Sequence, residues 1–93
     1  MDKYLILFTM KGCPYCEQLK EKLNENNLNY IERDINENSD EYDIFVEITE
    51  NEYVPAFMII EDDKETPKSK LFAPERDFNT LDEGVELIKK EIL

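Results

Sequence analysis

The chain has 93 residues, which is enough for one small domain, because at this size folding buries only about 60% of the unfolded chain's surface. It carries 23 acidic and 11 basic side chains, and the net charge of −12 disfavours binding to nucleic acid and to anionic membranes. The absence of histidine excludes a Ser-His-Asp triad, a Cys-His nucleophile pair and imidazole metal sites. The longest apolar run, residues 4–8, is too short for a signal peptide or a membrane span, so we expect a cytoplasmic protein.

The first half of the chain alternates strand and helix patterns. Residues 3–9 are apolar and rich in strand formers, and they lead into Gly12 and Pro14, which favour a tight turn and the start of a helix. A helix is predicted over residues 14–26, and its apolar face consists of Cys16, Leu19 and Leu23. Residues 28–35 alternate apolar and polar side chains, which predicts a second strand, parallel to the first because a helix connects them.

The second half predicts a further helix and a β-hairpin. Ser39 is the expected cap of a helix that ends near Asn51, and the apolar stripe of this helix consists of Ile44, Phe45 and Ile48. Residues 56–60 form a continuous apolar run of strand length, and residues 71–72 offer another short strand. The charged stretch between these two strands is expected to form a long hairpin tip over residues 62–69.

A closing helix completes the expected fold. Thr80 and Glu83 have the spacing of a capping box, and the apolar positions behind them are Leu81, Val85, Ile88 and Ile92. Gly84 inside this helix lowers its intrinsic stability, and the sequence offers no reason for it. The order β-α-β-α-β-β-α predicts a single α/β domain over residues 1–93, with three layers and helices on both faces of a small mixed four-stranded sheet.

The motif Cys13-Pro14-Tyr15-Cys16 carries the clearest chemical signal. Cysteines three positions apart at a helix start lie within disulfide reach, and the unpaired amides and the helix dipole favour a thiolate at Cys13. Thiols of Cys-x-x-Cys motifs at such positions have pKa values of about 3.5 to 7.5, so the thiolate needs no histidine. Cys16 lies on the apolar helix face and should be more shielded, which suits it to resolve a disulfide formed at Cys13.

Two other interpretations of the cysteine pair remain open. A Cys-x-x-Cys pair is half of a zinc site, and because the chain has only two cysteines and no histidine, such a site would need a second chain. Alternatively, both thiols could simply be small buried apolar groups. The position of the motif, directly after a strand and opening a helix, favours redox chemistry over both.

The chain resembles dithiol glutaredoxins of the thioredoxin superfamily. The resemblance rests on the motif Cys13–Cys16 after the first strand, on Val54-Pro55 before an apolar strand, and on the element order, and it covers almost the whole chain. It implies a thioredoxin-like fold, catalysis by Cys13 and Cys16, glutathione as the reducing co-substrate, and no tightly bound cofactor. The implied partners are disulfide-containing and glutathionylated proteins, and we expect the chain to act as a monomer.

The resemblance also implies a glutathione site. It implies a cis peptide between Val54 and Pro55, where the backbone N–H and C=O of Val54 pair with the cysteinyl part of glutathione as a short added strand. Tyr15 would flank the bound tripeptide, and Lys11 would meet the glycine carboxylate. Asp77 would take the place of the aspartate that binds the ammonium group.

The chain departs from the family pattern at three places. Glutaredoxins commonly place a basic residue three positions before the first cysteine, where this chain has Met10. The usual Thr-Val-Pro has Tyr53 as its first residue here. The Gly-Gly-x-Asp pattern after the last strand is replaced by residues 72–77, in which only Glu75 or Asp77 could supply the carboxylate.

Alternative functions follow from these departures. Without the two glycines, the chain could be a glutaredoxin-like redoxin that thioredoxin reductase reduces. A protein that holds an iron–sulfur cluster between two chains through Cys13 and glutathione is another alternative, although Pro14 and Tyr15 make the helix start stiff and crowded. A pure interaction module is suggested only by the acidic surface.

Overall fold

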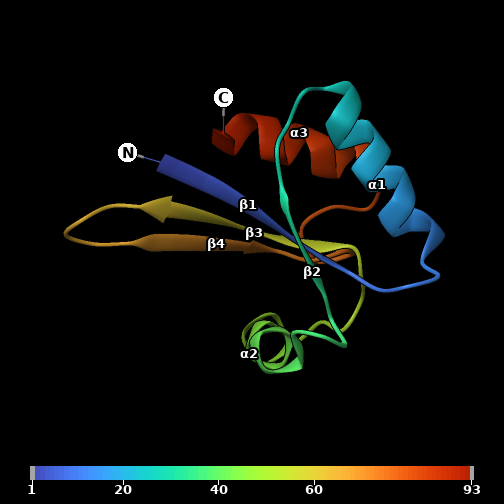
Figure 1. Cartoon of the computed structure of the whole chain (residues 1–93), viewed down its shortest axis with the longest axis horizontal. Coiled ribbons are helices and arrows are strands. Elements are labelled where there is room, and N and C mark those ends of the chain that lie inside the picture. Colours follow the sequence, from blue (N-terminus) through green and yellow to red (C-terminus); the bar gives the residue numbers. More distant parts are fainter. Residues whose placement is uncertain (1, 93) are drawn as a thin grey trace.

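The computed structural model describes residues 2–92, and its elements follow the expected order (Figure 1). The elements are β1 (Asp2–Thr9), α1 (Pro14–Glu25), β2 (Ile31–Asp34), α2 (Ser39–Thr49), β3 (Ala56–Asp62), β4 (Lys68–Phe72) and α3 (Leu81–Ile92). The predicted order β-α-β-α-β-β-α is therefore confirmed. Within residues 2–92, none of the helices combines the length and the apolar character needed to cross a bilayer.

The four strands form one mixed sheet in the order β2-β1-β3-β4. β1 and β2 are parallel, with Ile6 opposite Ile31, as the connecting helix predicts. β3 runs antiparallel to β1 and forms a hairpin with β4, in which Met58 lies opposite Leu71. β1 is an inner strand of the sheet and ends at Thr9. The loop that follows, which leads to Cys13, therefore begins between the two neighbouring strands β2 and β3.

Helices cover both faces of the sheet, as expected (Figure 1). Side chains alternate along β1, so Leu5 and Leu7 join the core cluster with α1 and α3, while Ile6 and Phe8 join the cluster with α2. The first cluster also contains the buried side chains Leu19, Leu23, Phe57, Ile59, Val85 and Ile88. The second contains Tyr42, Phe45, Ala56 and Ala73. The three-layer α/β architecture is thus confirmed.

Four predicted boundaries were wrong, those at the starts of α2, β2 and β4 and at the end of β3. Ser39 is the first residue of α2 rather than its cap, since the N-cap position is Asn38, which makes no side-chain capping hydrogen bond. β2 begins only at Ile31, because the segment after α1 is still bonded to the helix: the Leu28 N–H donates to the Leu23 carbonyl at 2.9 Å. β3 and β4 are longer than expected, since charged residues of an exposed hairpin pair as strands without an apolar signal, and the tip shrinks to residues 63–67.

The start of α3 agrees with the capping pattern. The hydroxyl of Thr80 accepts a hydrogen bond from the Glu83 N–H at 3.1 Å, which satisfies one of the free amides of the first turn. Gly84 is buried, and a Cβ built there would lie 3.4 Å from the ring of Phe78. The glycine that the sequence left unexplained therefore lies where α3 packs against an aromatic ring.

Candidate active site

A tight turn positions Cys13 at the start of α1. Gly12 has φ of +77°, a conformation that side chains rarely adopt, and the Cys13 N–H donates to the Met10 carbonyl at 3.3 Å. Cys13 itself is the N-cap residue with extended backbone, and Pro14 occupies the first turn, where its missing N–H has no cost. The turn therefore carries the chain directly from the end of β1 to the positive end of a helix dipole.

The two cysteines are joined by a disulfide, with their Cα atoms 5.3 Å apart. The Sγ of Cys13 also accepts a hydrogen bond from the Cys16 N–H at 3.2 Å, so the helix amide that would stabilise a thiolate already points at this sulfur. Cys13 is 8% exposed and Cys16 is fully buried. The greater shielding expected for Cys16 is present, and an incoming group can reach only Cys13.

The segment before β3 forms the opposite wall of the site. The Val54–Pro55 peptide is cis, as the resemblance implies. The chain ahead of it is held from two sides, because the Tyr42 hydroxyl donates to the Glu52 carbonyl and the Asn51 side-chain amide donates to the Pro74 carbonyl, both at 2.7 Å. Asn51 thus bridges the loop before β3 and the loop after β4.

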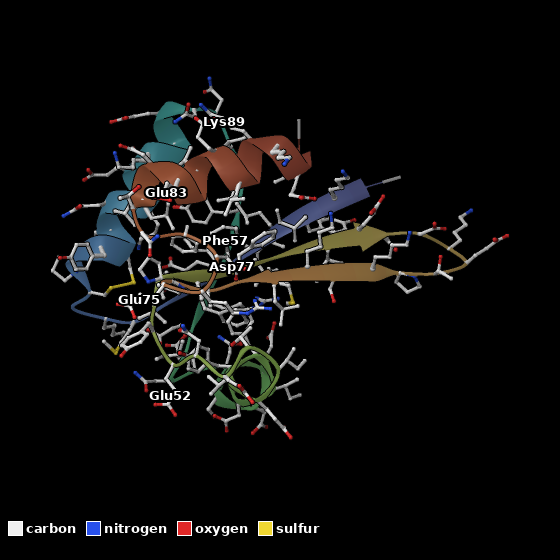
Figure 2. All side chains as sticks on the ribbon, turned by 180° about the vertical axis from the view of Figure 1, so that it is seen from behind. Glu52, Phe57, Glu75, Asp77, Glu83 and Lys89 are labelled. Carbon is white, nitrogen blue, oxygen red and sulfur yellow. A yellow bond between two sulfur atoms is a disulfide. The ribbon has the colours of Figure 1, made fainter. Side chains whose placement is uncertain are left out.

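A cavity of about 540 Å³ opens between these two walls. Its lining residues are Tyr15, Gln18, Lys22, Val54, Pro55, Pro74, Glu75, Phe78, Asn79, Thr80, Leu81 and Asp82. Three of the predicted site residues, Tyr15, Val54 and Pro55, are brought together here although they lie far apart in the sequence. In Figure 2, the disulfide and the labelled Glu75 lie at the same end of the molecule.

Comparison with known proteins identifies the family. The glutaredoxin family model matches residues 5–63, well over half of the chain. This chain belongs to the glutaredoxin family. A glutaredoxin with a Cys-x-x-Cys pair that can close a disulfide is a thiol–disulfide oxidoreductase.

Two solved structures support the fold of this glutaredoxin. The thioredoxin-like protein BC3987 is 19% identical, with a TM-score of 0.58 over 92% of this chain and 96% of the other. A point mutant of the same protein gives 17% identity and the same TM-score, over 92% and 95%. At this identity the likeness establishes a thioredoxin-like fold. No curated protein matches the sequence significantly.

Two predicted site residues of the glutaredoxin lie outside the cavity. Lys11 lines a separate hollow of about 290 Å³, together with Met10 and Glu17. The carboxylate of Asp77 accepts hydrogen bonds from the Ala73 N–H at 2.9 Å and the Arg76 side chain at 2.8 Å, which uses it to close the turn after β4. The structure therefore does not bring Lys11 and Asp77 to the cavity that Tyr15 lines, and it gives Asp77 a role in the turn.

The first turn of α3 contributes to the cavity instead. Thr80, Leu81 and Asp82 line it, and a helix N-terminus is a favourable place for an anion. Asp82 also forms an ion pair with Lys22 at 2.9 Å, and Glu75, with φ of +68°, occupies the wall where the family has its glycines. The carboxylate partner was expected directly after β4, whereas these groups lie at the start of α3, which the capping pattern at Thr80 predicts from the sequence.

An ion network supports the loop before Cys13. The Lys20 ammonium contacts the carboxylates of Glu17 at 2.8 Å and Glu32 at 2.9 Å, and the Thr9 hydroxyl donates to Glu32 at 2.8 Å. The hydrogen bonds from Lys20 and from Thr9 lower the pKa of Glu32, and the two carboxylates raise the pKa of Lys20. These contacts connect the end of β1 with α1 and β2, next to the loop of residues 10–13 that carries Cys13 (the redox loop).

Proposed function

We propose that this glutaredoxin reduces protein disulfides and protein–glutathione mixed disulfides with glutathione as its reductant. Two observations together carry the proposal. The Cys13 sulfur caps a helix, and a cavity of about 540 Å³ is lined by Tyr15, the residue between the two cysteines in the motif, and by Pro55. The Cys13 sulfur has a helix amide directed at it, and the cavity has room for part of a small peptide.

Deglutathionylation needs only Cys13. Its thiolate attacks the glutathione sulfur of a mixed disulfide, a Cys13–glutathione disulfide forms, and the substrate thiolate leaves and takes up a proton. The thiolate of a second glutathione then attacks the glutathione sulfur on Cys13. Glutathione disulfide leaves, and the Cys13 thiolate is restored.

Reduction of a protein disulfide needs both cysteines. The Cys13 thiolate attacks one substrate sulfur and releases the other as a thiolate. Cys16, after loss of its proton, attacks the Cys13 sulfur, so the substrate leaves with both sulfurs reduced and the Cys13–Cys16 disulfide forms. The short Cα separation of 5.3 Å allows this second step without movement of the helix.

The polar groups of the cavity suit a zwitterionic peptide. The free amides at the start of α3 favour the γ-glutamyl carboxylate, and the carboxylates of Glu75 and Asp82 favour the ammonium group beside it. Lys22 is the basic residue among the lining residues, so the proposal gives it the role of carboxylate partner that was expected for Lys11. Val54 keeps the expected role of pairing with the cysteinyl backbone.

Two serine variants in a glutathione-coupled assay test the proposal. We expect Cys13→Ser to lose all activity, because the only other thiol, that of Cys16, is fully buried. Cys16→Ser should retain deglutathionylation and lose the reduction of a dithiol substrate. Full activity of Cys13→Ser, or equal loss of both reactions in Cys16→Ser, would contradict the mechanism.

One observation favours thioredoxin reductase as an alternative electron donor. Pro74 stands in the cavity wall, where it supplies no N–H, and Glu75 beside it replaces a glycine by a carboxylate. Pro74 removes a backbone donor, the Glu75 N–H already donates to the Phe78 carbonyl at 2.8 Å, and the Glu75 side chain occupies space that a glycine would leave free. The oxidised protein should be incubated separately with glutathione and with thioredoxin reductase plus NADPH, and the free thiols counted. Faster reduction by the reductase would overturn glutathione as the reductant and leave the thiol chemistry intact.

A further inference from the structure

The negative charge of the chain is concentrated in one third of its length. Residues 34–63 contain eleven acidic and no basic side chains, whereas the rest of the chain carries twelve acidic and eleven basic ones. Eight of these eleven carboxylates belong to α2 and its flanking segments, residues 34–52, and the other three lie at the end of β3. Among the ion pairs of residues 2–92, only Arg33 with Glu41, at 3.7 Å, involves this stretch.

One face of α2 is exposed and combines this charge with apolar side chains. Tyr42 and Phe45 bury the opposite face against the sheet. The exposed face consists of Asp40, Asp43, Ile44, Glu47 and Ile48, and we call these five residues the α2 face. Ile44 is 59% exposed and Ile48 is 63% exposed, so the helix presents two adjacent isoleucines between carboxylates.

The α2 face continues to the redox site. After α2 the chain passes through Glu50, Glu52 and Tyr53 before it reaches the cis peptide opposite Cys13. Glu50 and Glu52 are exposed, and Tyr53 is 60% exposed. In Figure 2, Glu52 and Glu75 lie at the end of the molecule that holds the disulfide. A protein whose disulfide reaches Cys13 would therefore extend over an acidic surface that is interrupted by apolar side chains.

We propose that the α2 face docks the protein substrate, and that this substrate carries lysines or arginines around an apolar patch beside its disulfide. The inference rests on the proposed reduction of protein disulfides by Cys13 and Cys16. Charge complementarity selects the occupant, because carboxylates without basic neighbours attract a basic surface and accelerate its approach. The isoleucines add apolar contact area that holds the docked partner. A second copy of this chain is disfavoured, since two such faces repel each other.

Matched disulfide peptides test the docking surface directly. Two peptides of equal length share one disulfide and the same apolar residues, and they differ only in having lysine or glutamate beside these residues. The glutaredoxin is reduced with dithiothreitol, freed of it, and mixed with each peptide in a single turnover, so the result is independent of the physiological reductant. We expect the basic peptide to react at least about ten-fold faster at low salt.

Substitutions on opposite faces of the molecule show which surface causes the preference for the basic peptide. Asp43→Lys combined with Glu47→Lys should abolish the preference for the basic peptide, and Ile44→Ser combined with Ile48→Ser should slow both peptides several-fold. Glu21→Lys, on the exposed side of α1, makes the same kind of charge change far from α2 and should keep the preference. All variants should reduce cystine at the rate of the unmodified protein.

The outcomes separate the inference from the function on which it rests. If no peptide is reduced by the unmodified protein, the proposed reduction of protein disulfides fails. If both peptides react equally fast, or if Glu21→Lys removes the preference as fully as the α2 substitutions do, the docking surface is wrong while that function stands. Self-association through α2 would also overturn the proposed docking surface. It would appear as a sedimentation coefficient that rises with protein concentration, and Ile44→Ser would abolish this rise.

Discussion

At the scale of single residues, the only two glycines of the chain have different structural roles. Gly12 adopts a backbone conformation with φ of +77°, and nothing lies within 4 Å of the position that a Cβ would take. Gly84 has ordinary helical backbone, and a Cβ there would make van der Waals contact with Phe78 at 3.4 Å and Phe57 at 3.6 Å. The first glycine is required by conformation, whereas the second leaves room for a methyl group.

Alanine substitutions at the two glycines should therefore change stability in opposite directions. Gly84→Ala should raise the free energy of unfolding by about 0.5 to 1 kcal/mol, because it improves helix propensity and its methyl group fits beside the ring of Phe78. Gly12→Ala should lower it by about 1 to 2 kcal/mol, because alanine is strained at positive φ. Urea unfolding measures both. Destabilisation by Gly84→Ala would show that α3 cannot accommodate the extra atom.

Asn51 links two loops that wall the cavity of about 540 Å³, and it is a positioning residue for the glutathione binding that we propose there. Its side-chain oxygen accepts from the Tyr53 N–H at 2.9 Å, and its amide donates to the Pro74 carbonyl at 2.7 Å. Asn51→Ala should cost about 1 to 2 kcal/mol of stability and raise the KM for glutathione more than it lowers kcat, because the two cavity walls lose their link. Asn51→Asp keeps the acceptor and loses the donor, so it should raise KM as well. A normal KM in Asn51→Asp would show that the bond to Pro74 is dispensable.

At the scale of elements, the polar network of Thr9, Lys20 and Glu32 joins β1, α1 and β2 beside the redox loop. The folded protein lowers the pKa of Glu32, chiefly through the hydrogen bond from Lys20 and then through that from Thr9. A carboxylate with a lowered pKa stabilises the folded state above its ordinary pKa of about 4.3, and this stabilisation disappears as the pH falls through the lower value of the folded protein.

Acid unfolding should reveal this contribution. Because the Glu32 side chain is 42% exposed, we expect it to supply less than about 1 kcal/mol near neutral pH. Between pH values of about 6 and 3, the unmodified protein should lose more stability than Glu32→Gln, which has no carboxylate to protonate at this position. Glu21→Gln, on the exposed side of α1, is the matched control and should follow the unmodified protein. Parallel pH profiles of Glu32→Gln and the unmodified protein would contradict the assigned cause.

The sequence predicted those features whose signal is local. The spacing of Cys16, Leu19 and Leu23 defined the buried face of α1, and the Thr80 pattern defined the start of α3. It did not reveal contacts that form only when the loops of the fold are complete. Asp77 seemed available for a ligand until the fold showed its carboxylate bound to Ala73, a bond that requires the complete turn after β4. Asn51 gave no signal because its partner, Pro74, lies 23 residues away.

At the scale of the whole molecule, the two proposed reaction partners meet surfaces of different charge: glutathione meets the cavity, and the protein substrate meets the α2 face. The cavity where we propose that glutathione binds has Lys22 at its wall, but this cation already pairs with Asp82. All charged residues of the α2 face are acidic. Glutathione is an anion, so a chain with net charge −12 repels it. A basic protein substrate is attracted by the same charge. The same field therefore slows one half of the proposed catalytic cycle and accelerates the other.

Ionic strength should separate the two halves of the cycle. Raising the salt from about 0.01 to 0.15 M shortens the screening length from about 30 to 8 Å. Over this range, reduction of the oxidised protein by glutathione should become faster, and the single-turnover reaction with the basic disulfide peptide should become slower. The combined Asp43→Lys and Glu47→Lys substitutions should weaken the salt dependence of the peptide reaction more than that of the glutathione reaction, because the α2 face is proposed to bind only the protein substrate. A glutathione reaction that slows with salt would mean that local cations such as Lys11 and Lys22, rather than the overall charge, govern its approach.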